Sequence, residues 1–519
     1  MSEWWKDGVI YQIYPRSFQD TTGNGIGDLK GITSRLGYLE DLGIDAIWIS
    51  PIFPSPMKDA GYDVSDYTGI DPTFGTLEDF EALVADAHAR GMKVLLDFVP
   101  SHTSDRHPWF EEARASKDSP KRDWYVWRDP APDGGPPTNW ISEFAGPAWT
   151  LDEATGQYYL HVFLREQPSL NWHNRELREA MYDVMRTWFD RGVDGFRVDA
   201  VENMGPDPEA GDNPPNPDWV ESMGPARSHL GTNTKHQPVI FDIAREMRAV
   251  AEEYDPPRLL VGEAYGEIPQ VMKYYGDALD AFQQPFNFLL IEAEWDAGNL
   301  VGLITEYEAA LPEGAWPNWV LGNHDRARIA SRVGPAQARN AMMLLLTIRG
   351  TPTIYQGDEL GMENVAIPPD RVQDPWEKNV PGQGLGRDPV RTPIAWEDGP
   401  FGGFSTVDPW LPMDLGPERV VARQIASEGS MLAFTRALLK LRREMPELRR
   451  GTLEDVRAEG DVLRYARVLD GSRIEVLLNI GTEEAMLRPE GALILSTSGD
   501  STGAEDPLAP GEGRIIRAE

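Results

Sequence analysis

The short apolar run GFRVDA at 195–200 carries two opposite charges, Arg197 and Asp199, near its end. On a β-strand, side chains two residues apart point to the same face, so this guanidinium and this carboxylate lie together. Burying a charge without a partner is costly, which makes such residues uncommon in a strand that serves only the core. The pair therefore indicates a site of chemistry.

Three other apolar runs also end in ionisable residues. These are Asp97 with His102 shortly after it, Glu263, and His324 with Asp325. Each has an ordinary explanation when taken singly, because an acid after a strand often caps the next helix and a lone histidine often serves only as a hydrogen-bonding group. Four such ends in one chain make a shared site the better hypothesis.

The chemistry that these residues favour is glycoside hydrolysis by two carboxylates. The chain has no cysteine, which excludes thiolate catalysis and cysteine-based zinc sites. Arg197 favours the ionised form of Asp199, which suits a nucleophile. Glu263 follows the apolar run LLVG, where desolvation favours the protonated form that a general acid needs. A retaining mechanism requires the two carboxyl groups about 5 to 5.5 Å apart, which adjacent strand ends can provide, with Asp325 assisting the distorted sugar.

Short apolar runs alternate with amphipathic stretches over about the first 450 residues, a pattern typical of parallel strands connected by helices. Strands are expected at 8–18, 45–51, 92–100, 195–200, 258–265, 282–288, 317–325 and 351–357. Helices are expected at 32–42, 77–90 and 176–191, with the last one at about 431–445. Eight parallel strands predict a closed (β/α)8 barrel of the α/β class, whose active sites lie at the carboxyl ends of the strands. The charged ends then converge on one bowl.

Three long insertions interrupt this alternation. The segment 102–172 is rich in Trp, Pro and Gly and predicts an inserted subdomain after the third strand. The segments 203–237 and 362–395 are polar loops that would wall a pocket above the barrel mouth. From about residue 450 onward, alternation without helices predicts a C-terminal antiparallel β domain. The expected domains are the barrel at 1–101 and 173–449, the inserted subdomain B at 102–172 and the β domain at 450–519.

The charge composition restricts the partners. The 84 acidic residues outnumber the 49 basic ones, and the net charge of −35 argues against nucleic acid, anionic membranes and anionic substrates. The N-terminal stretch lacks a basic segment followed by an apolar one, and no segment reaches the roughly 18 apolar residues that a membrane helix needs. We therefore expect a cytoplasmic protein, a monomer or small homo-oligomer, that acts on a small neutral substrate.

Five segments carry a resemblance to a known family. DFVPSHTS at 97–104, GFRVDAVEN at 195–203, GEAY at 262–265 and NHD at 323–325 resemble, in order, the four signature regions of the alpha-amylase family of glycoside hydrolases, and QPSLNW at 167–172 resembles its fifth region. YPRSF, GNGIGDLKGI, ISPIFPSPMKDAGYDVSDY and GRDPVRTPIAW are similar to its oligosaccharide-cleaving alpha-glucosidases, the group of oligo-1,6-glucosidase and maltase. The resemblance implies Asp199 as nucleophile, Glu263 as acid/base and Asp325 as transition-state stabiliser.

The resemblance also implies residues around the terminal glucose: Asp59, Tyr62, His102, Arg197, His324 and Arg391, with Phe144 and Phe163 as apolar walls. A pair between Asp59 and Arg391 would close the pocket at the non-reducing end, so that single glucose units are released, and Arg387 is the less favoured partner. Ala200 follows the nucleophile where relatives that prefer 1,6 linkages tend to carry Val, which favours 1,4 or broad linkage use. Ser169 stands where close relatives usually have Asp.

The chemistry requires no cofactor, although TTGNGIGD at 21–28 resembles the family's metal loop. The oxygens that a structural Ca²⁺ or Mg²⁺ would use come from Asp20, Thr22, Asn24, the Ile26 carbonyl and Asp28. Thr22 and Asn24 stand where related enzymes often carry Asn and Asp, so the negative charge is lower and a glycine-rich turn without metal is an equal alternative. A metal among the acids at the strand ends is disfavoured because Arg197 lies between them.

These observations predict a retaining, exo-acting alpha-glucosidase that hydrolyses terminal alpha-linked glucose from short oligosaccharides or disaccharides through a covalent glucosyl-Asp199 intermediate, with transglucosylation as a further outcome. One alternative is a glucosyltransferase or isomerase of the same family, of the trehalose synthase or sucrose isomerase type, in which a sugar captures the glucosyl-enzyme. Another is a non-catalytic sugar-binding relative. The presence of all three carboxylates disfavours that reading.

Overall fold

The computed structural model describes residues 3–207, 209–487, 490–499, 503 and 506–518. Its centre is a closed parallel barrel with the strand order β1-β11-β10-β9-β8-β7-β3-β2. The barrel strands are β1 (Ile10–Ile13), β2 (Ala46–Ile49), β3 (Lys93–Phe98), β7 (Gly195–Val198), β8 (Leu259–Gly262), β9 (Gln284–Asn287), β10 (Asn318–Val320) and β11 (Thr351–Tyr355). Each lies within one of the eight predicted strands, so the predicted (β/α)8 barrel is confirmed.

Side chains alternate between the inside and the outside of the barrel. Leu95 of β3 and Val261 of β8 belong to an inner apolar cluster, whereas Phe196 of β7 packs in the larger cluster shared with the surrounding helices. Because the strand repeat is two residues, the inner column of β3 continues to Asp97 and that of β8 continues to Glu263. The ionisable residues therefore stand at the top of the barrel interior, directly above an apolar core.

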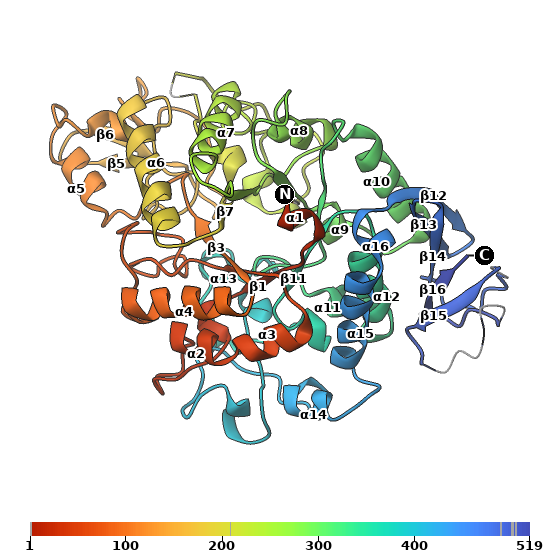
Figure 1. Ribbon diagram of the computed structural model, residues 1–519. Coiled ribbons are helices and arrows are strands. Elements are labelled where there is room, and N and C mark those ends of the chain that lie inside the picture. The colour runs from red at the N-terminus through yellow and green to blue at the C-terminus, as the bar shows by residue number, and fades with distance from the viewer. Residues whose placement is uncertain (1–2, 208, 488–489, 500–502, 504–505, 519) are drawn as a thin grey trace.

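The helices surround the barrel (Figure 1). They are α1 (Trp4–Asp7), α2 (Leu29–Ser34), α3 (Leu36–Leu42), α4 (Leu77–Ala89), α5 (Pro108–Ala115), α6 (Arg175–Asp190), α7 (Pro238–Ala251), α8 (Ile268–Met272), α9 (Leu289–Glu292), α10 (Ala297–Ala310), α11 (Ile329–Val333), α12 (Pro335–Thr347), α13 (Pro375–Asn379), α14 (Val421–Ile425), α15 (Met431–Glu444) and α16 (Pro446–Arg450). No described helix is both long enough and apolar enough to cross a membrane.

Two predicted helices differ from those observed. The helix expected at 32–42 is observed as two helices, α2 and α3. The first begins earlier than expected, because Asp28 caps it by accepting from the Gly31 N–H. The two helices are separated at Arg35, whose backbone leaves the helical region. The helix expected to be the last is followed by α16, since Met445 is extended before Pro446, and a residue that precedes proline disfavours the helical conformation.

Two smaller sheets flank the barrel on opposite sides (Figure 1). The segment between β3 and β7 contains a sheet of β4 (Trp127–Arg128), β6 (Gln157–Leu160) and β5 (Trp149–Asp152), in that order. The C-terminal sheet has the order β12 (Thr452–Glu459), β13 (Val462–Leu469), β14 (Ser472–Asn479), β16 (Gly513–Arg517), β15 (Ala492–Ser496), with all its pairs antiparallel. The predicted inserted subdomain and C-terminal β domain are therefore present.

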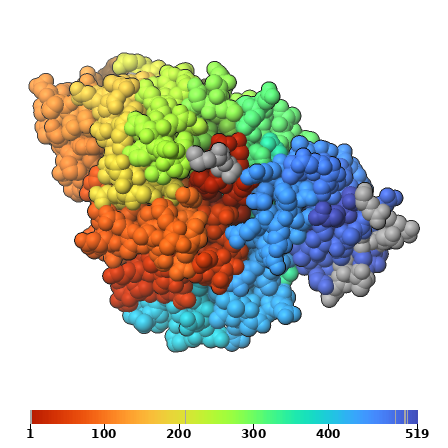
Figure 2. Space-filling model, in the orientation of Figure 1, coloured from red at the N-terminus to blue at the C-terminus, as the bar shows by residue number. Residues whose placement is uncertain are grey.

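The C-terminal sheet is attached to the barrel through a buried arginine. Arg467 of β13 donates to the carbonyls of Thr347 on α12 (2.7 Å), Leu448 on α16 (2.8 Å) and Gly451 (2.8 Å). Burial lowers the pKa of Arg467 to about 9. The early and late parts of the chain also meet on the surface, where red and blue segments touch (Figure 2), and Arg443 lies 3.5 Å from Asp45.

The start of β7 has no room for a side chain. A Cβ atom on Gly195 would lie 2.3 Å from the Leu259 carbonyl oxygen and 2.8 Å from a methyl carbon of Leu95. Both neighbours belong to the strands paired with β7. Glycine at this position is therefore what allows β3, β7 and β8 to approach one another.

We predict that Gly195→Ala lowers the free energy of unfolding by about 1 to 3 kcal/mol, because the added methyl overpacks the barrel interior. Thermal unfolding followed by circular dichroism measures this. Gly302→Ala on α10 is the matched control, since no heavy atom lies within 4 Å of its added Cβ, and its melting temperature should not fall. Equal melting temperatures for the two variants would contradict the packing argument.

Candidate active site

The guanidinium of Arg197 is the centre of the site. Its Nη1 lies 2.7 Å from Oδ1 of Asp97 and 2.7 Å from Oδ1 of Asp199, and its Nη2 lies 2.5 Å from Oε2 of Glu263. All four side chains are buried. The strand register produces this convergence, because Arg197 pairs with Asp97 on one side and with Val261, two residues before Glu263, on the other. Three carboxylates therefore share one cation.

Burial and mutual repulsion raise the pKa of two acids in this cluster. Burial raises the pKa of Asp97 to about 6, although Arg197 opposes it. Burial also raises the pKa of Asp199, which Arg197 lowers and the charges of Glu263 and Asp97 raise further. Arg197 by itself favours the ionised form of Asp199, as expected, while burial and the neighbouring acids act in the opposite direction. A cluster of this kind binds a proton at higher pH than separate carboxylates would.

The backbone after the nucleophile candidate is tightly turned. The backbone of Ala200 has the left-handed conformation (φ 44°, ψ 44°), which residues other than glycine seldom adopt. In this conformation its N–H donates to Oε2 of Glu263 at 2.9 Å. The N–H of Glu263 donates to the Val198 carbonyl at 2.8 Å. The turn therefore ties the ends of β7 and β8 together and orients the Glu263 carboxylate.

A hydrogen-bonded chain leads away from Asp97. Gln12 Nε2 lies 2.8 Å from Nδ1 of His324, His324 Nε2 lies 2.6 Å from the Tyr62 hydroxyl, and that hydroxyl donates to Asp97 at 3.0 Å. The rings of Tyr62 and His324 are stacked, with centroids 5.3 Å apart. Burial lowers the pKa of His324 well below its usual value, so the imidazole is neutral. With Gln12 donating to Nδ1, the proton of His324 sits on Nε2.

Asp325 is held by two arginines. Arg391 Nη2 lies 2.7 Å and Arg387 Nη1 lies 3.3 Å from its Oδ1. Burial raises the pKa of Asp325, but the guanidinium groups of Arg387 and Arg391 act against it, and the pKa lies well below the usual range. Asp325 is therefore ionised, whereas burial raises the pKa of Asp97 and Asp199 in the cluster around Arg197.

The expected pair between Asp59 and Arg391 is wrong, because Arg387 makes that contact. Arg387 Nη2 lies 2.6 Å from Oδ1 of Asp59 and 2.7 Å from Oδ1 of Asp374. Arg391 is held deeper, where its Nε donates to the His324 carbonyl at 2.8 Å. Asp374 also accepts from the backbone N–H of Arg387, which fixes this arginine toward Asp59. Arg387 thus joins three acids.

His102 lies between the barrel and the inserted subdomain. Its Nε2 is 2.9 Å from the Tyr62 carbonyl and its Nδ1 is 2.7 Å from the Ser101 hydroxyl. Burial lowers the pKa of His102 to about 4, so it is neutral. Gln167 lies 3.0 Å from its Nε2 and donates to Asp59 at 3.2 Å. Ser169 accepts from the Val162 N–H at 3.1 Å, so this short side chain supports the loop that carries Phe163.

These side chains surround an inner cavity of about 110 Å³. Eight of the predicted residues line it: Asp59, Tyr62, His102, Phe144, Phe163, Asp199, Glu263 and Asp325. The other three, Arg197, His324 and Arg391, lie outside the lining, where each contacts a residue that does line it. The structure therefore brings the predicted catalytic and substrate-binding residues together in one place.

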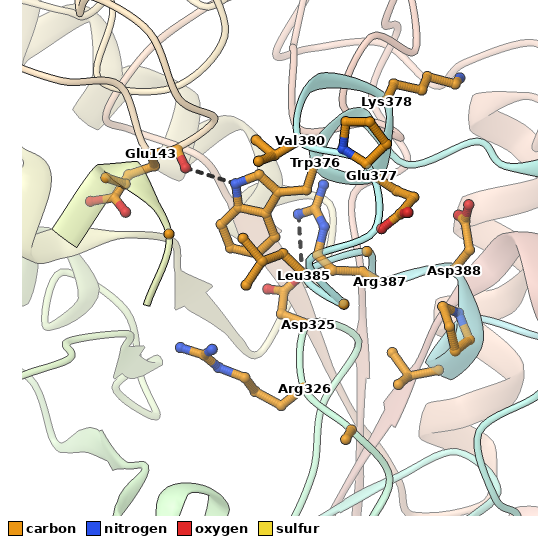
Figure 3. A pocket seen from close by; sticks show the side chains of 18 of the residues that line it. Glu143, Asp325, Arg326, Trp376, Glu377, Lys378, Val380, Leu385, Arg387 and Asp388 are labelled. Carbon is orange, nitrogen blue, oxygen red and sulfur yellow. Dashed lines mark hydrogen bonds and ion pairs between the residues drawn. The ribbon is translucent and has the colours of Figure 1, made fainter. Parts of the chain in front are cut away.

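A second, outer cavity of about 830 Å³ adjoins the inner one, and Figure 3 shows side chains that line it. Both are lined by Glu143, Arg227, Asp325, Arg326, Trp376 and Arg387. Trp376 stands at the boundary, where its indole N–H donates to the Glu143 carbonyl at 2.7 Å and its ring lies 5.3 Å from that of Phe144. The two cavities therefore lie next to each other and share one wall.

Several lining residues were not predicted. They are Glu143, Glu202, Asn203, Arg227, Lys235, Tyr265, Arg326, Trp376 and Arg387 as a lining residue. Most come from the three long insertions, where no periodic pattern shows which side chains point inward. Among them, only Trp376, an aromatic residue in the Pro-rich loop DPW, had a sequence pattern that could have indicated a sugar-binding role.

The oxygens of the predicted metal loop accept hydrogen bonds from the loop's own backbone. Asp20 accepts from the N–H groups of Thr22, Gly23 and Gly25, and Asp28 accepts from those of Thr21 and Gly31. Asn24 accepts from the Ile26 N–H. Among the described residues, no group of three or more acidic or histidine side chains is placed to hold a metal ion. The metal site stays a prediction, and no chemical step is derived from it.

Comparison with known proteins gives consistent matches. Residues 12–451 match the family model described as alpha amylase, catalytic domain. The chain is 42% identical over 501 residues to a probable alpha-glucosidase of Rhizobium meliloti (strain 1021), covering 93% of this chain and 90% of that protein. It is 39% identical over 483 residues to an oligo-1,6-glucosidase of Heyndrickxia coagulans, covering 85% of each.

Solved structures match over the whole chain. An alpha-glucosyl transfer enzyme, XgtA, superposes with a TM-score of 0.94 at 38% identity and 100% coverage of both chains. The trehalulose synthase MutB from Pseudomonas mesoacidophila MX-45 superposes with a TM-score of 0.91 at 35% identity, again with 100% coverage of both. These similarities extend beyond the barrel to both smaller sheets.

Glu202 is an acid in the inner cavity that the motifs do not assign. Its side chain is buried, and its Oε2 has no hydrogen-bond partner among the described residues. Burial raises the pKa of Glu202 to about 7, although Lys235 opposes it. The neutral form is therefore the one that the folded protein accommodates at acid pH.

We predict that Glu202 makes the protein less stable as pH rises. An acid whose pKa is higher in the folded state adds stability below its unfolded value, near 4.5, and loses it by about pH 7. Glu202→Gln should match the unaltered protein near pH 4.5 and be more stable by about 3 kcal/mol above pH 7. Denaturant unfolding between pH 4.5 and 8 measures the difference. Glu428→Gln, at an exposed position, is the control and should show no such trend.

Proposed function

The chain belongs to the alpha-amylase family of glycoside hydrolases, and we propose that it is a retaining, exo-acting alpha-glucosidase. Its substrates are short alpha-linked oligosaccharides or disaccharides, from which it releases the terminal glucose. The observation that carries the proposal is the contact of Asp199 and Glu263 with a single guanidinium at the inner cavity. Two carboxylates so close together suit attack by one of them on the sugar, whereas an inverting enzyme must leave space for a water.

In the proposed mechanism, an Asp199 carboxylate oxygen attacks C1 of the glucose, and the bond from C1 to the leaving oxygen breaks. Glu263 gives its proton to that oxygen. Glu263 then takes a proton from water, whose oxygen attacks C1 and releases Asp199. The negative charge of Asp325, held by Arg387 and Arg391, favours the oxocarbenium-like transition state.

The size and closure of the inner cavity support removal of one glucose at a time. The pair of Asp59 and Arg387 lies in its lining, and Phe144 and Phe163 add apolar surface. The buried carboxylate of Asp59 accepts hydrogen bonds, which suits the hydroxyl groups of a non-reducing end. A chain that continued past this glucose would have to displace the ion pair.

Ala200 lies in the same lining, which supports use of 1,4 linkages or of several linkages. One or two methyl groups in a pocket change the discrimination between two linkages by only about 1 to 3 kcal/mol, which is consistent with broad linkage use. The names of the relatives include both alpha-glucosidase and oligo-1,6-glucosidase.

A second candidate function is glucosyl transfer or isomerisation. It is favoured by the match of this chain, over its full length, to the structures of an alpha-glucosyl transfer enzyme and a trehalulose synthase. The first half of the reaction is the same in both functions, and only the group that captures the glucosyl-enzyme differs. Quantifying glucose and transfer products from maltose, isomaltose, sucrose and trehalose separates the two.

We predict that the first sugar released is alpha-glucose. Two successive displacements at C1 restore the original configuration, so proton NMR during the first minutes of hydrolysis should detect the alpha anomer before mutarotation. Release of beta-glucose first would overturn the retaining mechanism.

We also predict that Asp199→Asn lowers kcat by at least about a thousandfold, because an amide oxygen is a far weaker nucleophile. The variant should keep the far-ultraviolet circular dichroism spectrum of the unaltered protein. Asp41→Asn, at an exposed position on α3, is the control and should keep full activity. A near-normal rate for Asp199→Asn would refute its assignment as nucleophile.

A further inference from the structure

A further cavity of about 390 Å³, here called the side cavity, shares no lining residue with the inner cavity. The ionisable residues of its lining are four cations and three acids: Arg16, Lys58, Lys378, Arg391, Glu166, Asp374 and Asp388. Most of these residues have no part in the chemistry proposed above. The side cavity is therefore a separate place where a charged ligand could bind.

Three of the four cations have no acid partner. The partly buried guanidinium of Arg16 lies over the ring of Trp410, with its carbon 4.5 Å from the ring centre. Its Nη1 contacts the Met57 sulfur at 3.4 Å, and its Nε has no hydrogen-bond partner. Among the described residues, no carboxylate lies within ion-pair distance of Arg16, Lys58 or Lys378. Lys58 and Lys378 are both exposed, and so are free to turn toward a ligand.

The acids of the lining already have partners. Glu166 lies 2.9 Å from Arg165, and Asp374 lies 2.7 Å from Arg387. The Asp388 carboxylate accepts from the backbone N–H of Asp374 at 2.9 Å. The side cavity therefore keeps an excess of positive charge, although the whole chain has a net charge of −35.

Such a lining suits an oxyanion. Guanidinium and ammonium groups form charge-assisted hydrogen bonds, and the planar guanidinium matches the geometry of phosphate. Burial lowers the pKa of Arg16, because its positive charge loses water without gaining a counter-charge. An anion in the side cavity supplies that counter-charge, whereas a neutral sugar does not.

The side cavity also joins the two loops that close the inner cavity. Lys58 directly precedes Asp59 in the chain. Lys378 belongs to α13, which begins directly after Asp374, and its side chain extends away from Arg387 (Figure 3). Asp59 and Asp374 both contact Arg387, at 2.6 and 2.7 Å. An anion held by both lysines would therefore hold together the loops that form the ion pair of Asp59 and Arg387.

The loop that carries Asp59 needs such support. Met57 and Ala60 on either side have positive φ angles of 59° and 52°, a conformation that persists only where the surroundings hold it. Asp63 holds the loop from one side, where it accepts from the N–H groups of Lys58 and Asp59 at 2.9 and 3.0 Å. An anion on the Lys58 ammonium would hold it from the other.

We propose that the side cavity binds a phosphate group, either free or as the ester of a small molecule, through Arg16, Lys58 and Lys378. The bound phosphate stabilises the ion pair of Asp59 and Arg387, and it thereby strengthens the binding of glucose in the inner cavity. This second part rests on the alpha-glucosidase function, whereas the binding of phosphate does not.

Calorimetric titration of the full chain measures the binding, with inorganic phosphate and glycerol 3-phosphate as separate ligands. At least one of them should bind with a Kd of about 1 mM or lower, and the tighter one shows whether the site prefers free phosphate or an ester. Sodium chloride at the same ionic strength is the control and should give no saturable heat, because it only screens charge. Absence of saturable binding for both phosphates would overturn the proposal.

Substitution of the two exposed lysines localises the site without disturbing the core. The double variant Lys58→Gln, Lys378→Gln should raise the Kd for phosphate at least about tenfold, because it removes two charge-assisted contacts. Lys440→Gln, at an exposed position on α15, is the matched control and should keep the Kd. An unchanged Kd in the double variant would overturn the assignment to this cavity.

The effect on glucose binding is measured with 4-nitrophenyl alpha-glucoside. Saturating phosphate should lower KM at least about fivefold, a coupling of ordinary size between two sites, and the double lysine variant should lose this response. The change should fall on KM and not on kcat, because the ion pair lies beside the sugar before and during the reaction. An unchanged KM with phosphate bound would overturn the coupling and leave the phosphate site standing. Absence of nitrophenolate under all conditions would instead overturn the glucosidase function, and the coupling with it.

Discussion

The site depends on one electrostatic constraint, the burial of three carboxylates around the guanidinium of Arg197. Such a group is stable only if the geometry is close and the remaining oxygens find donors, because breaking a buried ion pair costs about 3 to 5 kcal/mol. The strand register supplies the geometry, and the N–H of Ala200 and the hydroxyl of Tyr62 supply two of the donors. The same constraint keeps the cluster partly protonated, which a nucleophile and a general acid together require.

Asp325 is controlled in the opposite way. Two guanidinium groups and few competing acids keep it ionised, although it is as close to the inner cavity as Asp199 and Glu263. One side of the cavity therefore retains a proton and the other retains a negative charge. This division arises from which arginine each carboxylate meets, since the carboxylates themselves are chemically alike.

The sequence was sufficient for the features that depend on local pattern. The apolar runs located all eight barrel strands, and the charged strand ends located Asp199, Glu263 and Asp325. It was insufficient where long loops meet. The pairing of Asp59 with Arg387, and not with Arg391, depends on how Asp374 positions the loop, and no periodicity encodes that. Trp376 was missed for the same reason, whereas Glu202 lies in the turn directly after β7 and its inward direction depends on that turn. The helix predicted at 32–42 is interrupted at Arg35, whose side chain donates to Gln19, and this tertiary contact has no signal in the local sequence pattern.

Arg387 has a consequence for how the protein is made. Its contact with Asp59 joins residues 328 positions apart, and β1 closes the barrel by pairing with β11. During synthesis, the ribosome has released most of the chain before either contact can form. Asp59 therefore has no ion-pair partner at Arg387 until that residue has been added to the chain. Contacts of such long range also slow folding. The inner cavity is therefore complete only after residue 387 has been synthesised and β11 has closed the barrel.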